Sequence, residues 1–227
     1  MTSDPHHPGA ERLRKSALYW GWDLTFLPCE TWDPLFRCQQ ISQLEFLRRE
    51  KPEFFLYLDA WDTIFCGPPQ EMIFEKGVLT FCGDPLLGDW QNKALVARFT
   101  PDAFPPAKMD EFRFVNDGVI WGDPEILLDL GDDYLKNYPA SLNQDYFNLR
   151  YAFETSLRRN RLRVDSGVKT VINVMGMLAK AVDRNYNGRL TYKPLKTTPV
   201  IMHSPGTRPR DPIAPIPQWM EEEYASG

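Results

Sequence analysis

A continuous apolar run from Phe54 to Leu58, followed at once by an acidic residue, constrains the fold more than any other feature. Uninterrupted apolar runs of this length are typical of strands that are buried on both faces. The preceding segment, Asp33 to Glu50, repeats apolar residues at helical spacing and ends close to Pro52, so it predicts an amphipathic helix. A helix that leads into a fully buried strand indicates a sheet covered by helices.

The same alternation continues along the chain and predicts an α/β fold with a largely parallel sheet. The segment from Gly83 to Lys108, rich in proline, glycine and aspartate, is expected to be an excursion. Helices are expected at Ala10–Trp20, Pro68–Phe74, Pro124–Leu130 and Asn143–Leu157, and strands at Asp23–Leu27, Val78–Cys82, Arg161–Val164, Val171–Val174 and Val200–Met202.

Bulk composition excludes several classes of protein. The formal net charge of -5 does not favour nucleic-acid binding. We interpret the arginines at positions 158, 159, 161 and 163 as a solvated helix end, and the alternative is a local basic patch that would favour DNA. The four cysteines form no C-x-x-C pair, which argues against a zinc site. The segment Met1 to Pro8 has no apolar stretch, and no apolar run reaches the ~18 residues of a membrane span. We therefore expect no membrane span and a cytoplasmic location.

The chain is expected to form one catalytic domain, residues 1–206, followed by a tail. The tail, residues 207–227, carries four prolines and three consecutive glutamates, so we expect it to pack on the domain or to fray. Neither a P-loop nor a dinucleotide-binding glycine motif occurs in the sequence, so the most familiar nucleotide folds are not indicated.

Two carboxylates, Asp59 and Asp62, stand three residues apart directly after the predicted strand. Ligands of open α/β sheets collect at the carboxyl ends of strands. Carboxylate oxygens suit Mg²⁺ or Mn²⁺, and such ions typically bridge to phosphates. The alternative is a turn in which the aspartates cap the local backbone.

His203 follows a second predicted strand and precedes Gly206. Imidazole accepts Mn²⁺, and a glycine allows the backbone to approach a phosphate closely. Arg208 and Arg210 follow and offer guanidinium groups for phosphate oxygens. A structural role is the alternative for a lone histidine.

Two further polar segments interrupt apolar surroundings. Asn116-Asp117-Gly118 separates two apolar runs, and its alternative interpretation is a hairpin turn, since Asp-Gly is a strong turn signal. Asn143-Gln144-Asp145 begins a predicted helix, and its alternative is a helix N-terminus with Asn143 as the cap.

Together these motifs resemble the glycosyltransferase domain of procollagen lysyl hydroxylases and, more distantly, family eight glycosyltransferases. Asp59 to Asp62 resembles the D-x-x-D motif, and Asn116 to Gly122 resembles the L-N-S-G-G-F-x-G segment. Asn143 to Asp145 resembles D-D-Q in the first group and D-Q-D in the second, and His203 to Gly206 resembles H-G-N-G or H-x-x-G. Arg12 to Ala17 resembles the R-F-x-x-S-A helix, so the likeness keeps the same order along the chain.

The resemblance implies a type A glycosyltransferase fold, with a single Rossmann-like mixed sheet flanked by helices. It implies a UDP-sugar donor, Mn²⁺ (or Mg²⁺) as the cofactor, and retention of the anomeric configuration. The implied metal ligands are Asp59, Asp62 and His203; the residues assigned to the sugar or acceptor are Asn116, Asp117, Asn143, Gln144 and Asp145; those assigned to the donor are Asp59, Trp61, Gly206, Arg208 and Arg210.

The sequence also departs from the family pattern. The family's first strand, with its loop against the nucleotide, has no counterpart, so we expect a fold that lacks this strand. The family's D-D-Q is replaced by Asn143-Gln144-Asp145, and no lysyl hydroxylase portion is present. The expected acceptor is therefore left open between a glycan, a hydroxylysine in a protein and a hydroxymethylated base in DNA.

Two other functions are compatible with the same residues. A metal-dependent nucleotidyltransferase or phosphate-ester hydrolase would use the same carboxylates and cation. A non-catalytic binding module would keep the fold without the reaction. The oligomeric state is not indicated by any sequence feature.

Overall fold

The computed structural model describes residues 5–27, 37–85, 112–137, 147, 161–174, 181–184 and 189–204. In these residues the chain forms a mixed α/β structure, as the sequence predicts. The helices are α1 (Pro8–Trp20), α2 (Arg37–Glu50), the short 3₁₀ helix η1 (Pro69–Glu71) and α4 (Pro124–Asn137). The strands are β1 (Phe55–Leu58), β2 (Thr63–Phe65), β3 (Leu79–Asp84), β4 (Phe114–Gly122), β5 (Leu162–Asp165), β6 (Val171–Asn173), β7 (Val182–Arg184), β8 (Leu190–Tyr192) and β9 (Ile201–His203).

The main sheet has four strands in the order β1-β4-β3-β5, and it is mixed. The pairings β1–β4 and β3–β4 are antiparallel, and β3–β5 is parallel. The mixed sheet that the resemblance implies is therefore confirmed: β1, β3 and β5 run in one direction, and the long strand β4 runs against both of its neighbours. A three-stranded sheet, β2-β9-β6, and a two-stranded sheet, β7-β8, accompany the main sheet.

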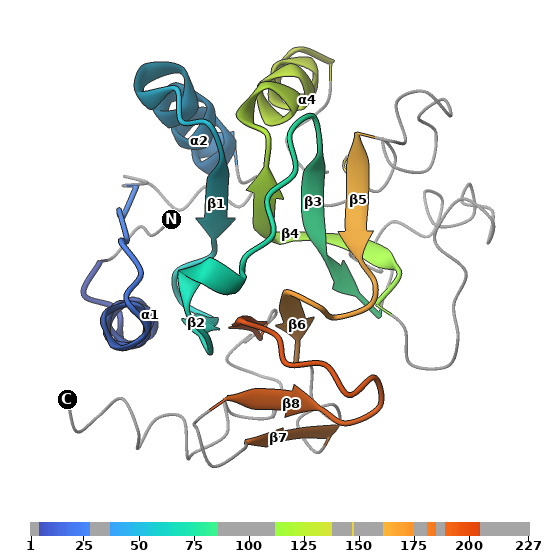
Figure 1. Cartoon of the computed structure of the whole chain (residues 1–227). Helices are drawn as coiled ribbons and strands as arrows, with labels where there is room; N and C mark the ends of the chain where they lie inside the picture. The colour runs from blue at the N-terminus through green and yellow to red at the C-terminus, as the bar shows by residue number, and fades with distance from the viewer. Residues whose placement is uncertain are drawn as a thin grey trace, which may run out of the picture.

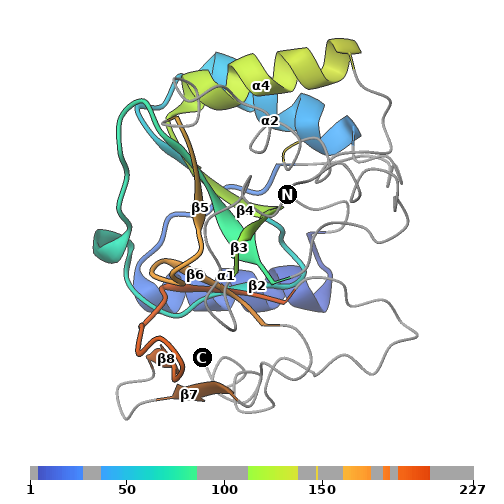
Figure 2. The same cartoon turned by 90° about the vertical axis from the view of Figure 1, so that its right-hand side faces the viewer.

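Two layers flank the main sheet, one on each face (Figures 1 and 2). Helices α2 and α4 lie together on one face and pack on side chains such as Phe81 and Ile120. Helix α1 and the three-stranded sheet lie on the other face, where Leu58 and Val119 are buried. Successive residues of β4, Val119 and Ile120, thus face opposite layers, as the pleat of a strand requires. Burial on both faces explains why these strands are continuously apolar.

Several predicted elements are confirmed at nearly their expected bounds. Strand β1 ends at Leu58, directly before Asp59, and β9 carries His203 as its last residue. Helix α1 begins at Pro8, where proline suits the first turn, and its C-cap is Gly21 with a φ of 78°. Helix α4 continues to Asn137, past the expected end at Leu130.

One expectation is wrong in the described residues, and one alternative interpretation is excluded. The segment Asp23–Leu27 forms no strand. Asn116-Asp117-Gly118 is no hairpin turn, because β4 runs through it without a break. The residues of β4 between Asn116 and Ile120 are accommodated as a β-bulge. The register of the β3–β4 pairing shifts there, between Phe81 and Cys82 of β3.

Some predictions lie outside the described residues. They include most of the helix Asn143–Leu157, of which only Phe147 is described, and the excursion beyond Pro85. The tail, residues 207–227, also lies outside them, so the proposed division at residue 206 stays a prediction. Among the described helices, none has the length and apolar character needed to cross a membrane.

Candidate metal centre

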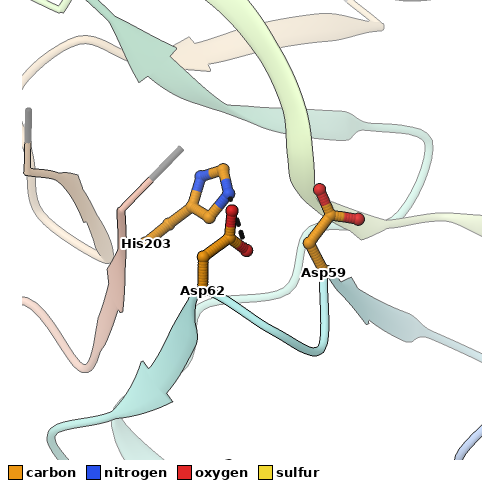
Figure 3. Close-up of side chains that lie close together, drawn as sticks. All are labelled: Asp59, Asp62 and His203. Carbon is orange, nitrogen blue, oxygen red and sulfur yellow. Dashed lines mark ion pairs between the residues drawn. The ribbon is translucent and has the colours of Figure 1, made fainter. Parts of the chain in front are cut away.

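Three side chains from two distant parts of the chain meet where the chain leaves β1 and enters β2 (Figure 3). Asp59 follows β1, Asp62 precedes β2, and His203 ends β9. One carboxylate oxygen of each aspartate and one ring nitrogen of the histidine all lie within 4.8 Å of one another. A nitrogen and two carboxylate oxygens form a donor set that suits Mn²⁺ or Mg²⁺.

Backbone pairing explains how residues so far apart in the sequence meet. Thr63 of β2 is the antiparallel partner of His203, and the Ser204 amide donates to the Asp62 carbonyl at 2.8 Å. The Asp59 amide donates to the carbonyl of Gly118 in β4, also at 2.8 Å. The loop that carries both aspartates is therefore tied to β4 at one end and to β9 at the other.

Two polar atoms in this cluster are buried without a hydrogen bond. They are Oδ1 of Asp62 and Nε2 of His203, which lie 3.5 Å apart and form an ion pair when the histidine is protonated. Leaving such buried atoms without a hydrogen bond costs about 1–3 kcal/mol each, so native proteins seldom do so without a reason. A cation between them would satisfy both atoms, and the residues present therefore fit a divalent metal.

The strand β4 leaves room for the imidazole only because residue 118 is glycine. A Cβ atom at Gly118 would lie 2.2 Å from Cε1 and 2.5 Å from Nε2 of His203. The amide of Gly118 also donates to Oδ1 of Asn116 at 2.9 Å. The polar tripeptide in β4 therefore shapes the wall of the site.

Asn116 and Asp117, both predicted site residues, occupy different surroundings. The Asn116 side chain is buried, and its Nδ2 donates to Asp84 at 3.0 Å. Because both ends of the Asn116 amide are engaged within the protein, its contacts favour a positioning role. Asp117 is partly exposed and lies close enough to Tyr57 for its charge to raise the pKa of that phenol.

Trp61, between the two aspartates, packs on the start of α1. Its ring stacks on His7 with the centroids 4.3 Å apart, and its carbonyl accepts a hydrogen bond from Arg12 at 3.2 Å. A Cβ atom at Gly9 would lie 2.0 Å from that carbonyl oxygen, so α1 can pack this closely on Trp61 only because residue 9 is glycine. The aspartate loop is thus held between α1 and the sheet. The other predicted site residues, Asn143, Gln144, Asp145, Gly206, Arg208 and Arg210, lie outside the described residues.

The charge states of the three side chains depend on one another. Burial, and then the like charge of Asp62, raises the pKa of Asp59 from 3.8 to about 6. Burial lowers the pKa of His203, but the charge of Asp62 and contacts with Asp62 and Cys82 outweigh it, so the pKa rises well above 6.5. Without a cation, the site therefore holds protons at a pH where exposed groups have lost them.

These shifts predict how stability depends on pH. The folded state binds the Asp59 proton more tightly than the unfolded chain, so this contribution to stability is lost as the pH rises from 3.8 to about 6. The contribution of His203 is present below its unfolded pKa and is lost as the pH rises through its folded pKa. A cation that replaces both protons should therefore stabilise the protein more at higher pH.

We expect Mn²⁺ to raise Tm little at about pH 5 and progressively more above about pH 6, because protons compete for the same atoms. Thermal unfolding across this range, with Mn²⁺ or with EDTA, measures the difference. A Mn²⁺ effect of equal size at every pH would contradict the assignment of these ligands.

Tyr57 also belongs to the site, although none of the sequence motifs includes it. Its hydroxyl donates to Oδ1 of Asp59 at 2.9 Å. Burial, and then the Asp59 charge, raises the pKa of Tyr57 well above 10, so the phenol stays protonated and remains a donor. Residues two apart in a strand share a face, and this spacing is the signal that could have revealed Tyr57.

Replacing Tyr57 by phenylalanine should weaken Mn²⁺ binding about tenfold, because it removes the hydrogen bond that orients Asp59 and favours its charged form. Titration of the protein with Mn²⁺, followed by the EPR signal of the free ion, measures the change. Tyr19→Phe, at a residue 60% exposed in α1, is the control. Equal affinities in wild type and Tyr57→Phe would show that the hydroxyl has no role in the site.

Comparisons with family models and curated proteins found no match, whereas a comparison with solved structures found similar chains. A solved structure, the crystal structure of a glycosyltransferase involved in the glycosylation of the major capsid of PBCV-1, is similar with a TM-score of 0.49 and 13% sequence identity. The alignment covers 97% of this chain and 94% of that chain.

Proposed function

We propose that this chain is a metal-dependent glycosyltransferase of the type A fold that moves a hexose from a UDP-sugar to an acceptor hydroxyl. The observation that carries the proposal is the pair of buried atoms without hydrogen bonds, Oδ1 of Asp62 and Nε2 of His203, with Asp59 beside them. The order of the motifs along the chain, which resembles that of glycosyltransferases, supports the same reading.

In this proposal Asp59, Asp62 and His203 hold Mn²⁺ or Mg²⁺. The bound cation would supply neutralisation of the charge that develops on the diphosphate leaving group. Asp59 and Asp62 lie where the chain leaves β1 and enters β2, and backbone hydrogen bonds fix both ends of that loop. The ligands are therefore positioned before any substrate arrives, which avoids a cost of reorganisation during the reaction.

A pocket beside the aspartates supports a small-molecule ligand. It has a volume of about 270 Å³ and is lined mainly by apolar and aromatic side chains from α1, α2, β1 and residues 22–27. Tyr57 belongs to its lining and also contacts Asp59. Gln43 adds an amide whose Oε1 is buried without a hydrogen bond. An apolar pocket with a few polar groups is the usual form of a ligand site.

The remaining predicted residues complete the proposal. Asp117 is proposed to face the sugar or acceptor from β4, and Asn116 to hold that strand in place. Asn143, Gln144 and Asp145 are proposed to contribute to the sugar side, and Trp61, Gly206, Arg208 and Arg210 to the donor side. Retention of configuration and the choice among glycan, hydroxylysine and DNA acceptors remain parts of the proposal.

The test is ligand-dependent thermal stability, followed by a transfer assay. With Mn²⁺ present, UDP or a UDP-sugar at 100 times its Kd should add about 2.7 kcal/mol to stability. Radiolabelled UDP-glucose and UDP-galactose should then label an acceptor in a mixture of glycans, hydroxylysine peptides and hydroxymethylated DNA. UDP-sugar hydrolysis without transfer would favour a phosphate-ester hydrolase. No stabilisation by any nucleotide would refute the transferase proposal.

A further inference from the structure

We propose that Asn173 is a positioning residue that makes Nε2 the only nitrogen of His203 free to bind a cation. The inference rests on the proposed metal site and assigns a role to a residue that no motif includes. Oδ1 of Asn173 lies 2.8 Å from Nδ1 of His203, and both side chains are fully buried. The two residues are direct partners in the parallel pairing of β6 with β9, so the sheet itself brings them together.

The orientation of the Asn173 amide is fixed by a second contact. Its Nδ2 donates to the carbonyl oxygen of Gly83 at 2.5 Å. A carbonyl oxygen can only accept, so the amide cannot be turned around, and Oδ1 must face the imidazole. Oδ1 in turn can only accept, so Nδ1 of His203 must carry a hydrogen.

This requirement holds in both protonation states of the histidine. Nδ1 keeps its hydrogen whether the ring is charged or neutral, so only Nε2 exchanges a proton for a cation. Nε2 is the atom that faces Oδ1 of Asp62 at 3.5 Å and has no hydrogen bond. The other neutral form would place two lone pairs against each other at Asn173 and a hydrogen at the cation position. Outer hydrogen bonds of this kind commonly set the tautomer of a metal-binding histidine.

The position of Asn173 is set by the protein and not by a ligand. The carboxylate of Asp165, at the end of β5, accepts hydrogen bonds from the amides of Thr170 and Val171 at 2.7 and 2.9 Å. These bonds fix the turn that leads into β6. Strand β6 then pairs along its whole length with β9. The imidazole is therefore oriented before a cation binds.

Nitrogen NMR of the protein labelled with ¹⁵N-histidine tests the tautomer directly. The chain has three histidines, and comparison with His203→Gln assigns the signal of His203. We expect Nδ1 to be protonated throughout a pH titration, and Nε2 to lose its proton at high pH or on addition of diamagnetic Mg²⁺. A neutral ring with its hydrogen on Nε2 would overturn the inference.

Variants of Asn173 test the consequence for the cation. Asn173→Leu removes both hydrogen bonds at similar volume, and we expect a mixture of tautomers and about 10- to 100-fold weaker Mn²⁺ binding. Asn173→Asp keeps an acceptor at Nδ1 but loses the hydrogen bond to Gly83, so it should lower Tm, retain the tautomer and bind Mn²⁺ more tightly than Asn173→Leu. Ser16→Ala, which removes an equally buried hydrogen bond between α1 and β2, is the control and should lower Tm without changing Mn²⁺ affinity.

Different results would refute the metal site and the positioning role of Asn173. If Asn173→Leu binds Mn²⁺ as tightly as the wild type, Asn173 has no positioning role even though the metal site stands. If the wild type binds no divalent cation, the metal site is refuted, and the wild-type spectrum still decides whether Asn173 sets the tautomer. The wild-type spectrum also decides this point if Asn173→Leu does not fold.

Discussion

Replacing Asp62 by asparagine is expected to abolish both turnover and the stabilisation by Mn²⁺, while the fold remains intact. The side chain keeps its shape but loses the charge, and an amide is a much weaker ligand than a carboxylate. A catalytic metal contributes several kcal/mol to transition-state stabilisation. Because each 1.36 kcal/mol is a factor of ten, turnover should fall about a thousand-fold or more.

The same substitution should change the unbound protein in a predictable direction. Asp62 raises the pKa of both Asp59 and His203, so Asp62→Asn should lower both pKa values. Circular dichroism checks that the fold is intact, Tm with and without Mn²⁺ measures the stabilisation by the cation, and the transfer assay measures turnover. Asp183→Asn, at an exposed carboxylate paired with Lys193 at 3.2 Å, is the matched control and should change none of them. Wild-type turnover in Asp62→Asn would refute the site.

Replacing Gly118 by alanine should disable the site without removing any polar group. The added Cβ atom would lie 2.2 Å from Cε1 of His203, so the imidazole or strand β4 must move. Overpacking of this kind costs about 1–3 kcal/mol of stability. Since the ring can no longer occupy its place beside Asp62, we expect Mn²⁺ binding and turnover to fall at least a hundred-fold, in line with the upper range for disturbed metal sites.

Gly167→Ala provides the control for this prediction. Its added methyl group would lie 3.7 Å from the nearest side-chain atoms, an ordinary van der Waals contact. Isothermal titration with Mn²⁺ and denaturant unfolding separate the loss of binding from the loss of stability. If Gly118→Ala binds Mn²⁺ like the wild type, the imidazole of His203 is not a ligand in the position described.

The parts of the site that the sequence could predict are those that depend on local pattern. The apolar run before Asp59 and the strand before His203 are recognisable from continuous hydrophobicity, and both end where the polar residues begin. Polar residues at the ends of buried strands are expected to meet at the edge of a sheet. The proximity of Asp59, Asp62 and His203 is consistent with that expectation, and their role as ligands remains a prediction.

The features of the fold and of the site that the sequence did not predict depend on pairing between distant segments. Asn173 looks like the polar end of a short strand, and only the register of β6 against β9 shows that it faces His203. Asn116-Asp117-Gly118 has the local chemistry of a turn, but it stays within β4, where Asn116 pairs with Cys82 of β3 and the carbonyl of Gly118 accepts a hydrogen bond from the Asp59 amide. Tertiary pairing overrides local propensity in such strands.

Anomalous diffraction at the manganese edge, from crystals grown with Mn²⁺ and UDP, tests the central claim most directly. The account predicts one manganese peak bonded to a carboxylate oxygen of Asp59, a carboxylate oxygen of Asp62 and Nε2 of His203, with diphosphate oxygens completing its coordination. A structure with UDP bound and no manganese between these three side chains, or with manganese held by other residues, would contradict it.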